Sequence, residues 1–319
     1  MSPSRRRVVQ LVLTVLGLLL GPMPASAFCR TTTIPVVADF QPRPDRCWTQ
    51  GLPLYWKNAC VSYSIQRGAS RQIGLEDAAN SLSTAFTRWT GASCPTGGAG
   101  QSRVSIDVRD LGPVDCAAID YSQTGANQNV IVFRDDVWPH ADSNNTLALT
   151  TITFNPDTGE IYDGDMEINT ADVRVTLVDP VPPDGYDFGS IVTHETGHFL
   201  GLAHSGDPGA TMFASYQPGN TAMRNLTSDD VAGICEVYRP DGTRATLADT
   251  LTPATQCDPT PRRGFTVACA EQPAKSCLGN ARIAAAAPMR SGWLAVGVSL
   301  VVAASARRRR RGKHAAERP

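Results

Sequence analysis

The sequence predicts an α+β domain with one mixed β-sheet, and two patterns lead to this fold class. Short stretches in which apolar and polar residues alternate are typical of half-buried strands, and most of them precede residue 170. Longer stretches with apolar residues at helical spacing dominate after residue 186. The expected strands are 61–65, 104–108, 129–133, 147–154 and 162–169. The first expected helix is 76–89, the second follows Asp187 and includes Phe199, and the third starts near Thr227 or Ser228 and runs to Tyr238.

Local signals mark several of these elements. The apolar stripe of the first helix consists of Ala78, Leu82, Ala85, Phe86 and Trp89. Residues 155–159, Asn-Pro-Asp-Thr-Gly, separate the last two strands and predict a β-hairpin. Asp187 is placed to cap the second helix. Asp229 and Asp230 lie in the first turn of the third helix, where the helix dipole favours acidic residues.

The second helix carries a set of side chains suited to binding a metal ion. His194 and His198 are four residues apart and therefore lie on one face, where both can bind the same ion. Gly201 can turn the chain, because glycine adopts positive φ without steric cost, and His204 can then return to the ion. Three imidazoles with an open fourth position predict a catalytic zinc, and the adjacent Glu195 predicts a general base.

The pattern H-E-x-x-H-x-x-G-x-x-H is the metzincin signature, and the chain resembles the matrixin branch of these zinc peptidases. Met212 lies eight residues after His204 and resembles the methionine of the Met-turn. Tyr216 resembles a wall of the pocket for the residue after the scissile bond. The resemblance covers roughly residues 55–240. It implies a twisted mixed five-stranded sheet, three main helices and a zinc site in the cleft below an edge strand.

The resemblance also assigns roles to these residues. The zinc ligands would be His194, His198 and His204. Glu195 would be the catalytic base, and Met212 would form the floor beneath the metal. Ala214 stands where matrixins usually have proline, which leaves the shape of the pocket open.

The sequence marks no further metal site. His140 is the only other histidine in residues 55–240, so a second zinc site with three histidines cannot be built there. We expect His140 to be an ordinary loop or capping residue. Surface acids can hold Ca²⁺, but no D-x-D-x-D-G loop marks a site, so calcium is left unassigned.

The leading functional hypothesis is a secreted or surface-attached zinc metalloendopeptidase acting on protein or peptide substrates. A water activated by Glu195 would attack the peptide carbonyl. The alternative is a non-catalytic binding or adhesion protein stabilised by zinc, although such a protein has no need of a base at this position. A third hypothesis is a maturation protease of narrow specificity. The substrate backbone is expected to pair with the strand around Met166–Asn169.

The first residues predict export from the cell. Arg5–Arg7 precede the apolar run Val8–Leu20, and Ala25–Ala27 are small residues suited to cleavage, so residues 1–27 are expected to be a signal peptide. The mature chain would begin near Phe28 with a short segment, 28–54, before the catalytic domain. We expect the protein at the cell surface or outside the cell.

Residues 241–319 differ in composition from the domain. Residues 241–280 are rich in Thr, Pro, Ala and Gly and predict a linker or stalk with a disulfide, or a tiny disulfide-tied module. The apolar stretch Gly292–Ala306 precedes the cluster Arg307–Arg311. Residues 281–319 thereby resemble the sorting tails of myxobacterial surface proteins, which implies contact with the envelope membrane and removal by processing. The apolar stretch is shorter than the ~20 residues of a helical membrane span.

All nine cysteines follow the expected signal peptide, and export favours disulfides. The expected pairs are Cys60 with Cys94 and Cys257 with Cys269. Cys277 is the candidate for the unpaired cysteine, and Cys47 is expected to form a disulfide rather than to block the zinc.

The charge distribution excludes one class of partner. The formal net charge of the whole chain is −1, but residues 28–289 hold 18 basic and 29 acidic residues, a net charge of about −11. An acidic domain argues against nucleic-acid binding.

Overall fold

The computed structural model describes residues 27–95, 101–247, 250–269 and 294–301. Cys277, the arginine cluster and all but the last residue of the expected signal peptide lie outside these ranges. Among the described residues, no helix is long and apolar enough to span a membrane. The one described part of the expected anchor segment, Leu294–Val301, is a strand, β14.

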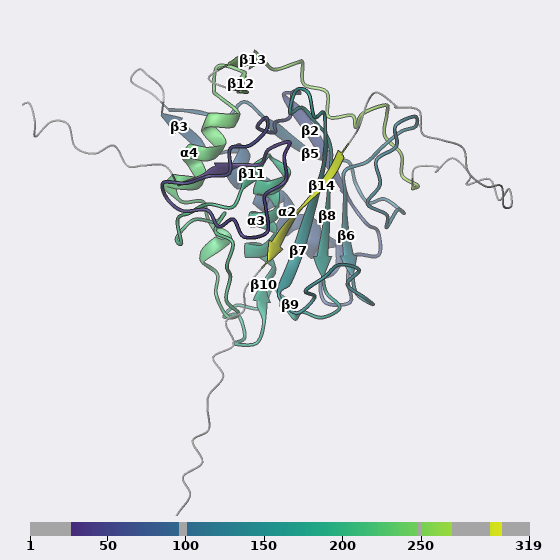
Figure 1. Ribbon diagram of the computed structural model, residues 1–319. Coiled ribbons are helices and arrows are strands. Elements are labelled where there is room, and N and C mark those ends of the chain that lie inside the picture. Colours follow the sequence, from purple (N-terminus) through teal and green to yellow (C-terminus); the bar gives the residue numbers. More distant parts are fainter. Residues whose placement is uncertain (1–26, 96–100, 248–249, 270–293, 302–319) are drawn as a thin grey trace, which may run out of the picture.

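The centre of the fold is a mixed sheet of five strands in the order β7-β8-β6-β2-β5, with β14 added beyond β7 (Figure 1). Its strands are β2 (Cys60–Ile65), β5 (Asp107–Asp110), β6 (Val130–Arg134), β7 (Thr146–Phe154) and β8 (Ile161–Asn169). Strand β2 is parallel to β5 and β6, and β6 is parallel to β8. Strands β7 and β8 form the predicted antiparallel hairpin, so the mixed five-stranded sheet is confirmed.

Within the described ranges, three α-helices accompany the sheet, as predicted: α2 (Leu75–Thr90), α3 (Phe188–Phe199) and α4 (Ser228–Val237). The predicted stripe of α2 is buried, and α2 packs on α3. Helix α3 lies against β7 and β8 and is buried over almost its whole length. The carboxylate of Asp187 accepts from the N–H of Ser190, which confirms the predicted cap.

Short elements complete the domain. They are β1 (Cys29–Arg30), β3 (Ser93–Pro95), β4 (Gln101–Arg103), β9 (Val175–Thr176), β10 (Tyr186–Asp187), β11 (Leu202–Ala203), β12 (Thr243–Ala245), β13 (Leu251–Pro253) and the 3₁₀ helix η1 (Ala222–Arg224). The β1–β11 pair holds the N-terminal segment against the chain that follows α3.

Two strand predictions need correction. The expected strand 104–108 is displaced, because β5 begins only at Asp107. Val104 and Ile106 are buried as the alternation suggested, but they lie in the connection before the strand. The proposed substrate edge around Met166 is also wrong. Strand β8 is paired on both sides, since Met166 lies opposite Thr150 on β7 and opposite Ile131 on β6.

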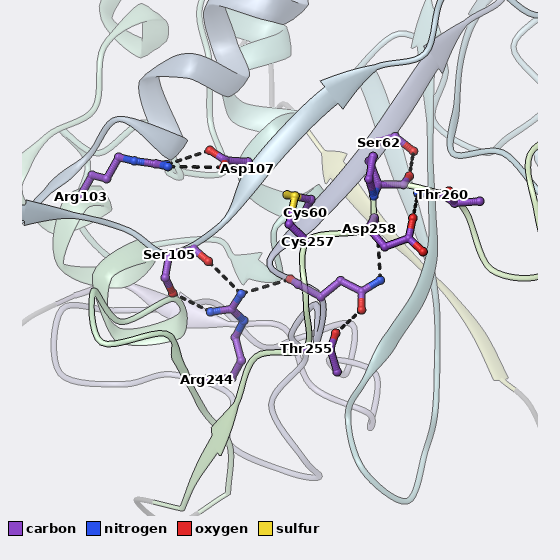
Figure 2. The surroundings of a disulfide bond; sticks show 12 residues. Cys60, Ser62, Arg103, Ser105, Asp107, Arg244, Thr255, Cys257, Asp258 and Thr260 are labelled. Atoms are coloured by element: carbon purple, nitrogen blue, oxygen red, sulfur yellow. Dashed lines mark hydrogen bonds and ion pairs between the residues drawn. A yellow bond between two sulfur atoms is a disulfide. The ribbon is translucent and has the colours of Figure 1, made fainter.

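The chain after α4 runs back along the domain, and we call residues 243–247 and 250–269 the C-terminal strap. Disulfides join it to the domain at Cys60–Cys257 and Cys116–Cys269. Figure 2 shows the first of these, with Arg244 nearby. The guanidinium of the fully buried Arg244 donates to the main-chain oxygens of Trp56, Asn58 and Ser105, which lie far from it along the chain.

The disulfides correct the expected pairing. Cys94 is bonded to Cys235 on α4, so neither expected pair, Cys60–Cys94 or Cys257–Cys269, forms. The sequence suggested partners close along the chain, whereas the strap brings distant cysteines together. Cys47 does form a disulfide, with Cys29.

Candidate metal centre and active site

Three histidine side chains meet beside the C-terminal half of α3. His194 and His198 project from the helix, and His204 approaches from the segment after β11. Their ligand atoms lie within 4.8 Å of one another, and the ring centroids are 4.7, 4.9 and 5.3 Å apart. Within the described ranges, this is the single group of three or more His, Cys, Asp or Glu side chains close enough to share one metal ion.

The rings are oriented by main-chain oxygens. His194 Nδ1 lies 2.6 Å from the oxygen of Thr211, and His198 Nδ1 lies 2.8 Å from that of Leu202. A carbonyl oxygen can only accept, so each Nδ1 carries the proton and each Nε2 presents a lone pair. These two Nε2 atoms are 3.0 Å apart, and His204 Nε2 is buried without a partner in the described part of the chain. Facing lone pairs repel unless a cation binds them, so the donor set fits zinc.

The surroundings keep the imidazoles neutral. Burial lowers the pKa of His198 to about 4 and the pKa values of His194 and His204 well below the usual 6.5. For His194 and His204, the neighbouring imidazoles lower the pKa further. A neutral imidazole is the form that binds a metal ion.

Two glycines of the motif are required by their surroundings. Gly201 has a φ of +92°, which confirms the predicted turn, and a Cβ there would lie 2.9 Å from the oxygen of Leu54. A Cβ on Gly197 would lie 2.3 Å from Sδ of Met212 and 2.8 Å from Cζ2 of Trp89. Met212 is 1% exposed, so the methionine packs directly on the backbone of α3 between the two histidine positions.

Asp230 supports His194 through Thr211 and Met212, which belong to the Met-turn. The sequence did not reveal this role. The buried carboxylate of Asp230 accepts from the N–H groups of Thr211 and Met212. The oxygen of the same Thr211 accepts from His194. Asp230 also accepts from Thr227 in a capping box, so one carboxylate joins the start of α4 to a metal ligand.

Asp229 supports the chain segment that carries His204. Its carboxylate accepts from the hydroxyl of Ser205, the residue after His204. The second oxygen accepts from the backbone N–H groups of Ala27 and Phe28, at 2.6 and 2.9 Å. The helix-dipole argument placed both aspartates in the first turn of α4, but it did not predict these contacts.

Glu195 is fully buried beneath β7, next to the histidines. Its Oε2 accepts from the hydroxyl of Thr150 at 2.5 Å, and its Oε1 has no partner among the described groups. Burial raises the pKa of Glu195 to about 8, although the hydrogen bond from Thr150 acts in the opposite direction. A carboxyl group whose pKa lies near neutrality can accept a proton and return it.

Tyr216 follows the Met-turn and is 3% exposed. Its ring lies 6.1 Å from that of Tyr186, and its hydroxyl donates to the main-chain oxygen of Asn220. Burial raises the pKa of Tyr216 to about 12, so the phenol stays neutral. The role of Tyr216 as a wall of the substrate pocket stays a prediction, as does the effect of Ala214 on the shape of that pocket.

His140 lies in a loop, and its Nε2 is 2.6 Å from the buried Glu167, which also pairs with Arg134 at 2.5 Å.

Two more buried acids, Asp163 and Asp165, lie on the same strand as Glu167 and share a hydrogen bond. Burial raises the pKa of Asp165 to about 8 and raises that of Asp163 strongly. This pair therefore retains a proton at neutral pH.

The segment that carries this site is similar to known proteins. Residues 111–239, which include the metal cluster, match the family model Peptidase_M10, described as matrixin. Human neutrophil collagenase is 25% identical over 183 residues, covering 57% of this chain and 33% of the collagenase. Human matrilysin is 37% identical over 103 residues, or 32% of this chain and 35% of matrilysin. Mouse matrilysin is 46% identical over 63 residues, 20% and 23% of the two chains. The chain thus spans about a third or less of the length of these relatives.

Proposed function

We propose that this domain, whose sequence and fold resemble those of matrixin-like metzincins, is a zinc-dependent endopeptidase. One observation carries the proposal. Three imidazole ligands converge within 4.8 Å, and the carboxylate of the neighbouring Glu195 is buried, with one oxygen that has no hydrogen-bond partner among the residues that the structure describes. A site that only stabilised the fold would have no use for that carboxylate.

The metal would be held by His194, His198 and His204, whose lone pairs face one another. Bound zinc would polarise the substrate carbonyl and lower the pKa of a water molecule. Glu195 accepts the proton of the attacking water at Oε1 and returns it to the departing amine. The Met-turn and Asp230 keep His194 in place during these steps.

The substrate would bind as an added strand. Strand β7 is the outermost of the five central strands, and it passes directly over Glu195. A peptide can pair with such an edge through main-chain hydrogen bonds alone, which suits a peptidase that acts on many sequences. The peptide would take the place that β14 occupies in Figure 1.

We also propose that the protein is exported, with residues 1–27 as its signal peptide and residues 281–319 as a segment that directs it to the envelope. The four disulfides of the described residues favour an oxidising compartment. Substrates would be proteins or peptides met there. We assign no residues to calcium.

Cleavage of an unfolded protein by the purified full chain tests the proposed activity. Wild type should cleave it, lose activity with a zinc chelator and recover with added zinc. Glu195→Gln should bind zinc but be inactive, whereas Glu76→Gln, a change at an exposed position on α2, should keep full activity. Equal inactivity of wild type and Glu195→Gln on a broad peptide library, with normal zinc binding, would favour the non-catalytic binding protein.

A further inference from the structure

Thr150 lies where β7 crosses α3, in contact with the proposed general base. Its side chain is fully buried. Its Oγ1 is 2.5 Å from Oε2 of Glu195 and 3.4 Å from the main-chain oxygen of Glu195. Both hydrogen bonds that the structure gives this hydroxyl therefore end on one residue.

The position of the hydroxyl is fixed by the sheet. Thr150 is paired with Met166 on β8, so its backbone is held within the sheet. Threonine is branched at Cβ, which restricts rotation about χ1. The strand thus presents a stationary donor to a glutamate whose own side chain has three rotatable bonds.

This contact gives the two carboxylate oxygens of Glu195 different hydrogen-bonding environments. Oε2 is engaged at a distance typical of a hydrogen bond to a charged oxygen. Oε1 is buried and has no partner in the part of the chain that the structure describes. A buried oxygen without a partner is costly, so Oε1 is the atom with unused capacity for a further donor. Rotation of the carboxylate would break the bond to Thr150 and remove this distinction.

We propose that Thr150 is a positioning residue, whose hydroxyl fixes the Glu195 carboxylate so that Oε1 faces the reacting water. This proposal rests on the proposed peptidase function. Thr150 itself touches no reacting atom. Valine at this position would preserve the shape of the side chain but leave the carboxylate free to rotate.

Kinetics of three full-length variants test the proposal. Thr150→Val should lower kcat by about 10- to 100-fold, with KM within about twofold of wild type, because the base is misplaced while substrate binding is unchanged. Thr150→Ser keeps the hydroxyl and should restore most of kcat. Thr32→Val is the matched control, since Thr32 is also a buried threonine but lies in the N-terminal segment, where its hydroxyl donates to the main-chain oxygen of Ile34. It should behave as wild type, and all variants should bind one equivalent of zinc.

Crystal structures of the same variants give a readout that needs no activity. In Thr150→Val, the Glu195 carboxylate should rotate or occupy two orientations, and in Thr150→Ser it should match wild type. The proposal is overturned if the carboxylate keeps its orientation in Thr150→Val, or if Thr150→Ser loses as much kcat as Thr150→Val. Should Thr150→Val fold poorly, Thr150→Ala supplies the same comparison without added bulk. Inactive wild type would defeat the proposed function, while the crystal structures would still decide the role of Thr150.

Discussion

Replacing Gly197 by alanine tests how closely the Met-turn packs on the metal-binding helix. At a solvent-exposed position within a helix, the change would stabilise the protein by about 1 kcal/mol, because glycine is a poor helix former. Here the new methyl carbon would lie 2.3 Å from Sδ of Met212 and 2.8 Å from Cζ2 of Trp89. Real carbon atoms do not approach so closely, so at least one neighbour has to move.

The two neighbours differ in their freedom to move. Met212 is flexible and can change rotamer, although it is 1% exposed and has little space. Trp89 is rigid, and its Nε1 donates to the oxygen of Thr193 at 2.8 Å. Overpacking of this kind costs about 1–3 kcal/mol, and the rigid ring favours the upper end. After subtraction of the propensity gain of about 1 kcal/mol, we expect a net destabilisation of about 2 kcal/mol.

Urea denaturation of the full-length protein with its disulfides intact measures this difference. Gly189→Ala is the control, because it lies on the same helix and its methyl would meet only ordinary contacts, the nearest at 3.4 Å from Asp187 Oδ2. It should leave the free energy of unfolding unchanged or raise it by up to about 1 kcal/mol. If Gly197→Ala were as stable as Gly189→Ala, the reasoning about close packing would be refuted.

Three other features lead to measurable effects. Folding raises the pKa of the Asp165 carboxyl to about 8, from an unfolded value of about 3.9. This shift stabilises the fold fully below pH ~3.9, and the contribution is lost as the pH rises towards 8. The free energy of unfolding of wild type should therefore fall by about 1.4 kcal/mol per pH unit between pH ~5 and ~7 relative to Asp165→Asn, and equal slopes would contradict this. Serine at both Cys60 and Cys257 should lower the free energy of unfolding by about 2–5 kcal/mol, and an unchanged melting temperature would count against it. A chain ending at residue 289 lacks β14 and should show a lower KM for a peptide substrate, because the edge of β7 is free; an unchanged KM would mean that β14 does not compete.

Local patterns predicted the elements that depend on local contacts. The stripe on α2, the cap at Asp187 and the turn at Gly201 all involve residues within a few positions of one another. The pairing of strands that are distant along the chain is not local, and two predictions that depended on it failed, although the local β7–β8 hairpin was predicted correctly. Alternation at Val104 and Ile106 correctly indicated burial, but the sheet begins only after them. Alternation also identified β8 as a strand without revealing that β7 is the outer one.

At the site, too, residues close along the chain were predicted and contacts between distant residues were missed. Spacing alone brought out His194, His198 and His204, because two lie on one helix turn and the third follows a short loop. The supporting residues were missed since their contacts cross long stretches of chain. Thr150 reaches Glu195 across 45 residues, and no spacing rule connects a threonine on a strand with a glutamate on a helix.

The disulfides of the C-terminal strap set a lower limit on where the chain can be shortened. Cys60 and Cys116 are synthesised early, and their partners follow 197 and 153 residues later. A chain cut at residue 240, just after the region that matches the family model, would leave both as free thiols available for incorrect pairing or intermolecular links. It would also leave the main-chain oxygens of Trp56, Asn58 and Ser105 without the guanidinium of Arg244. A shortened form for expression should therefore extend beyond residue 269 or replace these cysteines.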